Sequence, residues 1–338
     1  MAIIRIVALK MVMVCIFALA GSGALYQYIG TKLDEQKYPP IGRMVNIDGY
    51  KLHMIKAGQN NNGPTVVIEA GAGSNSLGWQ LVQPEIAKFV RVITYDRAGH
   101  GWSDASPLPR TSENIVKELH AMLHNAGIPA PYILVGHSFG GFTVRLFASM
   151  YPDEVAGVIL VDALNEKDFQ KRPSTLYENS WNYIERLKKL MKSYFGIARI
   201  MSDLEIDDIH KQLKNYSPFQ AYPVSHQQAC FAKMLTNKFV ASDIDERSNF
   251  VEDAEQLRQA GGLLGDKPLI VITAGKPWPG KENDDLNSVW PELQTDLVTK
   301  SSRGKQIIAE HSDHMVNLEQ PEIIVQAVRE MVDELRNT

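Results

Sequence analysis

Cysteine is nearly absent from this chain, whose 338 residues include only Cys15 and Cys230. The two lie far apart in the sequence, so we expect neither a disulfide nor a metal site built on thiolates. An excess of positive charge is also missing, because 35 basic and 39 acidic residues are interspersed and leave a net charge of −4. Without a basic stripe to neutralise phosphates, nucleic acid is not an expected partner.

Charge is missing altogether from residues 11–30, which follow Arg5 and Lys10. Such a stretch is long enough to cross a hydrocarbon core as a helix, and Tyr26 and Tyr28 suit a membrane interface. We therefore predict that residues 1–40 form a membrane anchor and a spacer. Basic residues ahead of the span predict a cytoplasmic N-terminus, with the remainder of the chain held at the outer face of the cell membrane.

A cleaved signal peptide is the alternative interpretation of this stretch. Residues 18–20, ALA, form a small-x-small site after a short apolar core, and cleavage there would release the chain as a secreted protein. Apolar character resumes at Ala24 and Leu25, beyond that site. The sequence therefore favours an uncleaved anchor.

The clearest motif lies in residues 131–151, PYILVGHSFGGFTVRLFASMY. An apolar strand-like segment is followed by GHSFGG and then by a helix-like pattern, which predicts a strand, a very tight turn and a helix. Gly136 and Gly140 relieve the crowding around Ser138, the residue at the apex of this elbow. The Ser138 hydroxyl would project above the sheet edge at a helix N-terminus, which suits a nucleophile whose reaction develops negative charge.

A second loop of small residues, EAGAGS at 69–74, follows a buried strand-like run at 65–68. Glycine and alanine there let backbone N–H groups approach a ligand closely. In a hydrolase with a serine nucleophile, the oxyanion hole combines the N–H after the nucleophile with one from such an earlier loop. We therefore nominate the N–H groups of Phe139 and Ala72, with that of Gly73 next.

Short β-branched runs alternate with helical patterns, which predicts a mostly parallel, doubly wound α/β sheet covered on both faces. After a hairpin at 44–56, the expected strands are residues 65–68, 90–95, 132–135, 158–161, 269–273 and 306–309. Residues 165–262 depart from this alternation and are rich in aromatic residues, methionine and charge. We expect a core formed by residues 41–164 and 263–338, with 165–262 as an inserted helical cap or lid.

Several titratable residues are interpreted as scaffold. Asp96 and His100 stand in a glycine-rich loop of mixed charge, which is typical of a structural turn braced by its own side chains. His120 and His124 are four residues apart on a predicted helix, but they lack the acidic residue of a metal-binding H-E-x-x-H motif. We therefore expect neither a metal nor an organic cofactor.

Taken together, these segments resemble the α/β-hydrolase fold family. The resemblance covers residues 44–333 apart from the predicted cap, and it rests on EAG at 69–71, YDRAGHGWS at 95–103, GHSFGG at 136–141 and SDH at 312–314. It implies a triad of serine, acid and histidine in that chain order, with Ser138 as nucleophile and His314 as base. A neutral imidazole takes the serine proton and later passes it to the leaving group. His311, nearer the strand end, is the rival base.

The acid departs from the family's common pattern. Many relatives carry it after the next-to-last strand as Gly-x-x-Asp, whereas this chain has GKPW at 275–278. Asp162 ends the strand after the elbow helix, an alternative acid position within the fold, and it keeps the expected chain order. Asp284 and Asp285, farther along the loop, are the other candidates. We favour Asp162 because a strand terminus holds a side chain more rigidly than a long loop does.

The resemblance and the serine nucleophile together imply acyl transfer to water through an acyl-enzyme. An apolar lid and a membrane tether suggest small-molecule carboxylic esters with an apolar acyl group. Amides, as in the related proline iminopeptidases, are the alternative substrates, and would make the chain an aminopeptidase or amidase. The rival from another class is a non-catalytic binding protein of the same fold.

Overall fold

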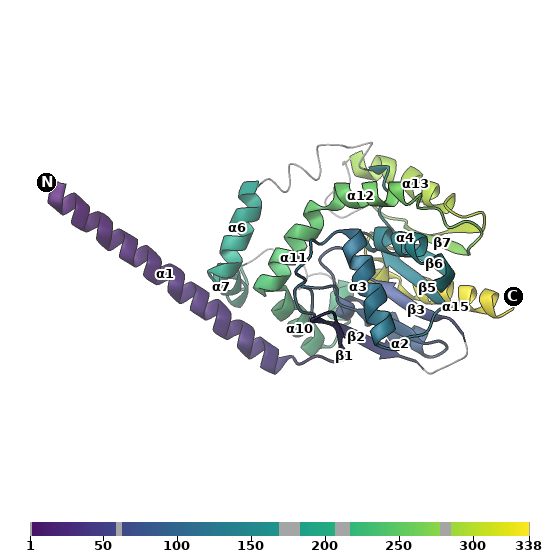
Figure 1. Cartoon of the computed structure of the whole chain (residues 1–338), viewed down its shortest axis with the longest axis horizontal. Coiled ribbons are helices and arrows are strands. Elements are labelled where there is room, and N and C mark those ends of the chain that lie inside the picture. The colour runs from purple at the N-terminus through teal and green to yellow at the C-terminus, as the bar shows by residue number, and fades with distance from the viewer. Residues whose placement is uncertain (1, 59–62, 169–182, 207–216, 278–284, 338) are drawn as a thin grey trace. The chain divides into compact units, whose positions relative to one another are not determined.

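The computed structural model describes residues 2–58, 63–168, 183–206, 217–277 and 285–337. The chain divides into two compact units. The smaller unit contains Met1–Pro39 and Ser180–Ala241, and the larger unit contains Pro40–Asn179 and Ser242–Thr338. Figure 1 labels most of the helices and strands and colours the chain by residue number.

One eight-stranded sheet forms the centre of the larger unit, in the order β1-β2-β4-β3-β5-β6-β7-β8. Its strands are β1 (Arg43–Ile47), β2 (Tyr50–Ala57), β3 (Thr65–Glu69), β4 (Val92–Tyr95), β5 (Tyr132–His137), β6 (Val155–Val161), β7 (Leu269–Ala274) and β8 (Gly304–Ala309). The β1–β2 and β2–β4 pairs are antiparallel, and the other neighbouring pairs are parallel. Asp48 and Gly49 turn the first hairpin with φ of 53° and 100°, as a tight Asp-Gly turn requires.

Helices pack on both faces of this sheet (Figure 1). They are α2 (Gln83–Ala87), α3 (Ser112–Asn125), α4 (Gly140–Met150), α12 (Phe250–Gln259), α13 (Asp285–Val298), α14 (Val316–Glu319) and α15 (Pro321–Arg336), with short 3₁₀ turns η1 (Ser76–Trp79) and η2 (Pro152–Glu154). Leu134 of β5 enters the core that contains α3, α4, α12 and α13, whereas Ile133 and Val135 enter the core that contains α2 and α15. Both faces are therefore buried, which explains why the strands read as continuous apolar runs.

The predicted fold class is confirmed: the molecule has a mostly parallel α/β sheet with inserted helices and a long apolar helix at the N-terminus. Five of the predicted strands, β3, β5, β6, β7 and β8, are longer than expected, and β4 is shorter. The extensions of β3 and β5 lie at their C-terminal ends. β3 and β5 remain paired as far as Glu69 and Gly136, and β5 and β6 as far as His137 and Val161. Parallel pairing to neighbours on both sides carries these strands through residues that seldom favour strands by themselves.

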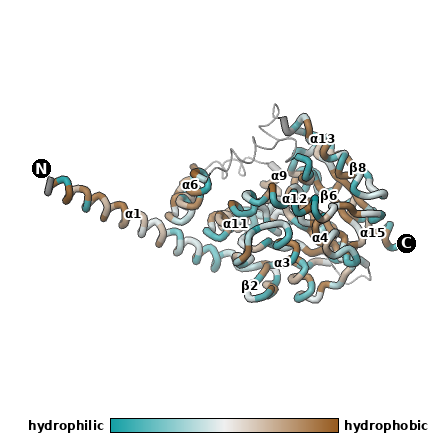
Figure 2. The backbone as a smooth tube through the Cα atoms, turned by 45° about the horizontal axis from the view of Figure 1, so that its top comes forward, coloured by the Kyte–Doolittle hydropathy of each residue, from teal (hydrophilic) through white to brown (hydrophobic). Residues whose placement is uncertain are grey.

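Every element of the smaller unit's described residues is a helix. The helices are α1 (Ala2–Lys37), α6 (Tyr183–Tyr194), α7 (Ile197–Asp203), α9 (Ser217–Gln220), α10 (Val224–Met234) and the first part of α11 (Asn237–Ser248). Within α1, Ile4–Lys37 has the length and composition of a membrane span, and its most apolar window has a mean hydropathy of 2.2 and is entirely exposed. The first part of α1 is largely hydrophobic in Figure 2.

The predicted cap, residues 165–262, does not form one unit. Residues 180–241 group with α1, whereas residues 242–262 group with the sheet. Residues 169–182 and 207–216 lie outside the described part of the chain. A lid function for this segment remains a prediction.

Candidate active site

Ser138 occupies a sharp turn between β5 and α4. β5 ends at His137, α4 begins at Gly140, and Ser138 has φ of 53°. A non-glycine residue in this left-handed region is strained, and such strain is concentrated at functional sites. A Cβ at Gly136 would lie 2.6 Å from both the Gly140 carbonyl oxygen and Val144 Cγ2. The turn therefore closes only because residue 136 is glycine.

A chain of hydrogen bonds joins Ser138, His314 and Asp162. The Ser138 hydroxyl donates to His314 Nε2 at 2.9 Å, and His314 Nδ1–H donates to Asp162 Oδ2 at 2.7 Å. The three residues come from the ends of β5 and β6 and from the loop after β8. The His314 side chain is 13% exposed and that of Asp162 is fully buried. Solvent can thus reach the imidazole, while the carboxylate behind it is shielded.

Asp162 is held by more than the imidazole. It follows β6 directly with φ of 41°, and its Oδ1 accepts hydrogen bonds from the Ala274 amide at 3.0 Å and from Trp290 Nε1 at 2.8 Å. Together with His314, these donors fix the carboxylate in one orientation. Of the other acid candidates, Asp284 lies outside the described residues, and Asp285 begins α13 but its side chain is also outside the description.

His311, the rival base, is exposed on the loop after β8. Its backbone amide donates to Gln320 Oε1 at 2.7 Å, and His311 lies within a tight turn that places the Ser312 amide 3.1 Å from the Ala309 carbonyl oxygen. The imidazole that contacts Ser138 is the one three residues later, at position 314.

His137 is a further site residue for which sequence reasoning offers no signal. Its Nε2–H donates to the His314 carbonyl at 2.9 Å, so the residue before the candidate nucleophile holds the backbone of the candidate base. Burial, reinforced by the electrostatic effect of the neighbouring His314, lowers the pKa of His137 to about 3. The ring is therefore neutral at physiological pH. Because the contact joins residues 177 positions apart, no local motif predicts it.

The loop after β3 lies directly against the elbow. A Cβ at Gly71 would be 3.2 Å from the Cβ of the candidate nucleophile, and one at Gly140 would be 2.6 Å from the Glu69 carbonyl oxygen. Only residues without side chains allow the two backbones to approach so closely. Ala72 follows in this loop, and Phe139 stands at the N-terminus of α4. The two residues nominated for an oxyanion hole thus belong to adjoining segments.

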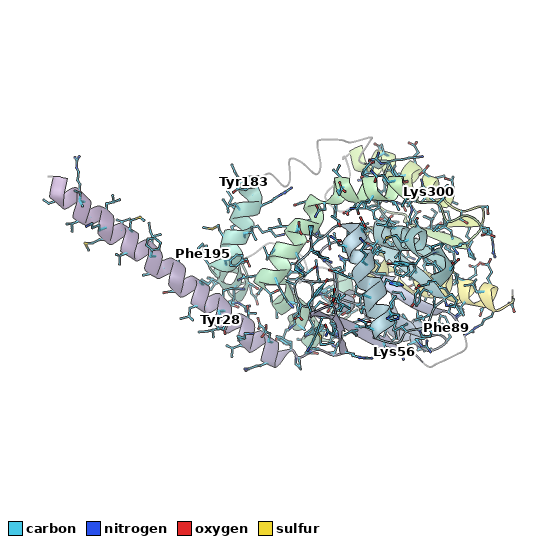
Figure 3. The ribbon with its side chains drawn as sticks, viewed as in Figure 1. Tyr28, Lys56, Phe89, Tyr183, Phe195 and Lys300 are labelled. Carbon is cyan, nitrogen blue, oxygen red and sulfur yellow. The ribbon has the colours of Figure 1, made fainter. Side chains whose placement is uncertain are left out.

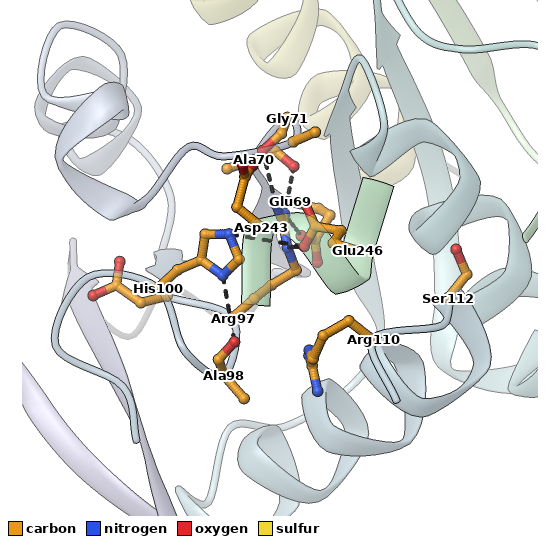
Figure 4. A network of polar contacts seen from close by, with 12 residues as sticks. Glu69, Ala70, Gly71, Arg97, Ala98, His100, Arg110, Ser112, Asp243 and Glu246 are labelled. Carbon is orange, nitrogen blue, oxygen red and sulfur yellow. Dashed lines mark hydrogen bonds and ion pairs between the residues drawn. The ribbon is translucent and has the colours of Figure 1, made fainter. Parts of the chain in front are cut away.

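The buried side chain of Arg97 holds the loop after β3 through hydrogen bonds (Figure 4). Arg97 Nη1 donates to Glu69 Oε1 and to the Ala70 carbonyl, both at 2.6 Å, and Nη2 donates to the Gly71 carbonyl at 2.8 Å. The other edge of the guanidinium binds Glu246 of α11, with Nε donating to Oε2 at 2.8 Å. One side chain therefore connects the loop beside the elbow to the end of α11.

The charges of this cluster depend on one another. Burial raises the pKa of Glu69, whereas Arg97 overcomes the effect of burial at Glu246 and holds the pKa of that carboxyl below its usual range. His100 lies 4.0 Å from Glu246, and burial lowers the pKa of its imidazole. His100 is therefore a neutral member of a structural network, in line with its interpretation as scaffold.

Asp96 braces the neighbouring turn. Its carboxylate accepts from the amides of Ser76 at 2.7 Å and Trp102 at 3.0 Å, and it contacts His53 Nδ1 at 2.8 Å. All four residues are buried. The contacts of Asp96 are thus those of a structural side chain.

The site can move a proton from a serine hydroxyl to an imidazole oriented by a carboxylate. Within the described ranges, no group of three or more His, Cys, Asp or Glu side chains is arranged to hold a metal ion. The groups that the site brings together are a serine hydroxyl, an imidazole, a carboxylate and the backbone amides of the adjoining loop.

Known proteins resemble this chain in both sequence and structure. A family model described as "Alpha/beta hydrolase family" matches residues 66–327. The uncharacterized protein YqjL of Bacillus subtilis is 25% identical over 282 residues, covering 83% of this chain and 88% of that protein. A thermophilic esterase from Thermogutta terrifontis has a TM-score of 0.61 at 20% identity and covers 87% of this chain and 98% of its own. The enol-lactonase from Burkholderia xenovorans has a TM-score of 0.62 at 17% identity and covers 86% and 100%. At these identities the structural similarity shows the fold alone.

Proposed function

The chain belongs to the alpha/beta hydrolase family, and from that premise we propose that it is a serine esterase acting through an acyl-enzyme at Ser138. The observation that carries this proposal is the hydrogen-bonded chain from Ser138 through His314 to Asp162. A serine hydroxyl is a weak nucleophile at neutral pH, and a neighbouring imidazole held in the correct tautomer overcomes that weakness.

In the proposed acylation, Ser138 Oγ attacks the ester carbonyl carbon while its proton passes to His314 Nε2. Negative charge develops on the carbonyl oxygen, where the N–H groups of Phe139 and Ala72 stabilise it. The bond from the acyl carbon to the alcohol oxygen then breaks, and the imidazolium proton goes to that oxygen. Asp162 stabilises the imidazolium through Nδ1–H. An alcohol leaves, and the acyl group remains on the serine.

Deacylation follows the same route with water as the nucleophile. His314 takes a proton from water as the water oxygen attacks the acyl carbon. The bond from that carbon to Ser138 Oγ then breaks, and the proton returns to Oγ. A carboxylic acid is released, and the site regains its starting protonation state without a cofactor.

We further propose that the substrates are small carboxylic esters with an apolar acyl group, and that α1 anchors the protein in the cell membrane with its hydrolase unit outside the cytoplasm. The exposed apolar surface of α1 and the basic residues ahead of residues 11–30 support the anchor. The aromatic and methionine residues of 165–262 support an apolar acyl group.

A fluorophosphonate probe tests the nucleophile directly, because it phosphonylates activated serines. We expect labelling of the wild type and none of Ser138→Ala. Ser149→Ala is the matched control: it lies on α4, its hydroxyl donates only to the Arg145 carbonyl at 3.1 Å among the described residues, and it should label normally. If neither protein labels, the esterase proposal is wrong and a binding protein of this fold becomes the better account. If Ser138→Ala labels as well as the wild type, another residue reacts with the probe and the proposal of Ser138 as nucleophile is wrong.

Substrate preference is measured with esters and anilides of the same acyl groups over a graded chain length. Ester turnover that exceeds anilide turnover and rises with acyl length supports the proposed substrate class. Faster cleavage of anilides with a free α-amino group would instead favour an aminopeptidase.

A further inference from the structure

The second half of α1 is tightly packed against other helices of the smaller unit. Gln27 is only 1% exposed, and its Nε2 donates to the Leu235 carbonyl at 2.7 Å. A Cβ at Gly196 would lie 2.6 Å from the Gly23 carbonyl oxygen, so backbones approach closely there. One face of α1 from residue 23 onward is therefore covered by protein.

An ion pair secures the same interface. Arg199 of α7 donates from Nη1 to Asp34 at 2.7 Å and from Nε to Gln27 Oε1 at 3.2 Å. The arginine is buried, and a Cβ at Gly30 would lie 2.6 Å from its Nε. A buried, charge-assisted pair with these contacts fixes α7 against α1 at a defined position along the helix.

This docking position overlaps the predicted membrane span. A helix needs about 20 residues to cross a hydrocarbon core about 30 Å thick, and the uncharged run is residues 11–30. Only residues 11–22 precede the docked part, and they supply about 18 Å of helix at a rise of about 1.5 Å per residue. If α1 spans a bilayer, the helices packed on residues 23–30 must therefore reach the depth of the lipid headgroups.

Those helices expose the kind of surface that such a position requires. On α6, Ile184, Leu187, Met191 and Tyr194 follow a helical spacing and are 44–59% exposed. On α7 and its C-cap, Ile197, Ile200 and Leu204 continue the pattern with 44–63% exposure. We call these seven side chains the α6–α7 apolar face.

Lysines and exposed tyrosines accompany this face. Lys188 and Lys192 of α6 are exposed and lie beside the apolar stripe on a helical wheel. Tyr183 at the start of α6 and Tyr28 on α1 are 78% and 62% exposed (Figure 3). An amphipathic helix with apolar residues on one face and lysines alongside is typical of helices that lie in the membrane interface, where tyrosine is also enriched.

We propose that the α6–α7 apolar face lies in the interfacial layer of the phospholipid bilayer that α1 spans. Its apolar side chains contact acyl chains, and Lys188 and Lys192 extend toward the phosphates. Lipid is the occupant that fits best, because this surface is held against α1, the proposed membrane span, whose own Leu25, Ile29 and Leu33 are also exposed. The proposal depends on the proposed anchor but not on the proposed reaction.

Single fluorophores on the full-length protein in phosphatidylcholine vesicles test this placement. In a Cys15→Ala, Cys230→Ala background, an environment-sensitive dye is attached at Leu187→Cys or Ile200→Cys. Val14→Cys reports insertion of the span, and Lys117→Cys, on an exposed position of α3 in the larger unit, reports water. Each variant is compared first with the wild type by thermal unfolding, and exposed positions should tolerate the change.

We expect the dyes at 187 and 200 to show blue-shifted emission and quenching by lipids that carry a nitroxide near the headgroup. The dye at 14 should be quenched best by a nitroxide deep in the acyl chain, and the dye at 117 by neither. Water-like emission at 187 and 200 with deep quenching at 14 would overturn the proposal and leave the anchor intact. Water-like emission at 14 as well would overturn both. A blue shift that lipid nitroxides do not quench, but that grows with protein concentration, would assign the face to a second copy and also overturn the proposal.

Discussion

Hydrogen bonds to both oxygens of Asp162 fix the orientation of its carboxylate. Its Oδ1 accepts from an amide and an indole, which leaves Oδ2 for the imidazole of His314. An asparagine at this position has one acceptor and one donor group. If the asparagine oxygen accepts from Ala274 and Trp290, its amide NH₂ group faces His314 Nδ1 and selects the wrong imidazole tautomer. If the oxygen instead faces His314, the donors of Ala274 and Trp290 lose their acceptor.

We therefore predict that Asp162→Asn lowers kcat by about 10⁴, the loss found when a triad carboxylate is replaced by its amide. Steady-state ester hydrolysis gives the measurement, and circular dichroism checks the fold. Asp284→Asn and Asp285→Asn are the matched controls and should keep near-normal turnover. Normal turnover in Asp162→Asn, with a large loss in one of the other two, would transfer the role of acid to that residue.

Arg97 holds the loop after β3 by donating hydrogen bonds to the carbonyls of Ala70 and Gly71. We predict that Arg97→Lys lowers kcat about 10- to 100-fold, by analogy with the residues that orient metal ligands through hydrogen bonds, with little change in KM. A lysine retains the charge but cannot reach Glu69, Glu246 and both carbonyls at once, because it lacks the planar fork of a guanidinium. The measurement is the separate determination of kcat and KM.

Arg110→Lys is the control for this prediction. Arg110 is also buried and binds Glu118 through two bonds of 2.7 Å, but within the described residues none of its hydrogen bonds or ion pairs reaches the loop at 69–74. Both variants should lose stability, since disturbing a buried pair costs up to about 3–5 kcal/mol. If kcat falls equally in both, the role of Arg97 is stability alone.

At the scale of elements, Asp253 links α12 to the N-terminus of α3. Its Oδ1 accepts from the Ser112 amide at 2.6 Å, while Oδ2 has no hydrogen-bond partner among the described residues. Burial raises the pKa of Asp253 to about 8. The carboxyl is therefore protonated in the folded protein under conditions in which an unfolded aspartate, with a pKa of about 3.9, is charged.

This difference makes the junction between the two helices sensitive to pH. Between about pH 4 and pH 8 the folded state binds the extra proton, so stability falls as the pH rises. We predict that wild type loses up to about 1.4 kcal/mol per pH unit in this window relative to Asp253→Asn, which is neutral throughout. Unfolding of both proteins in detergent across this range measures the difference, and Glu255→Gln, at a half-exposed position on α12, should give a small difference that changes little with pH.

At the scale of the whole molecule, the positions of α1 and the sheet-bearing unit relative to a membrane determine which compartment supplies the substrate. We predict that the mature protein keeps its N-terminus, remains in membranes after a carbonate wash, and exposes a C-terminal tag to protease on the outer face. Mass spectrometry of the intact chain gives the N-terminus. A chain that starts at Gly21 and is recovered in the soluble fraction would mean secretion.

The parts of this molecule that the sequence predicts are those set by neighbouring residues. The glycine pattern around Ser138, the strand runs and the hairpin at Asp48 are local, and each forms at the expected place. Contacts between distant segments are different. Arg97 and Glu246 form a hydrogen bond although they are 149 positions apart, and no residue pattern in either segment predicts this contact.

The candidate acid is a second feature that sequence patterns alone do not determine. Sequence patterns list Asp162, Asp284 and Asp285 as alternatives, because the choice depends on which strand end faces His314 rather than on any motif. The division of residues 165–262 between two units also has no local signal, since amphipathic helices look alike whether they pack on a sheet or on α1.

The indole of Trp290 shares the carboxylate of Asp162 with the imidazole and lies edge-on to the His314 ring, with centroids 6.3 Å apart. Because tryptophan emission responds to nearby charge, we predict that protonation of the imidazole in the proposed reaction changes the fluorescence of this side chain. Trp290 would then report on the proposed reaction without an added label.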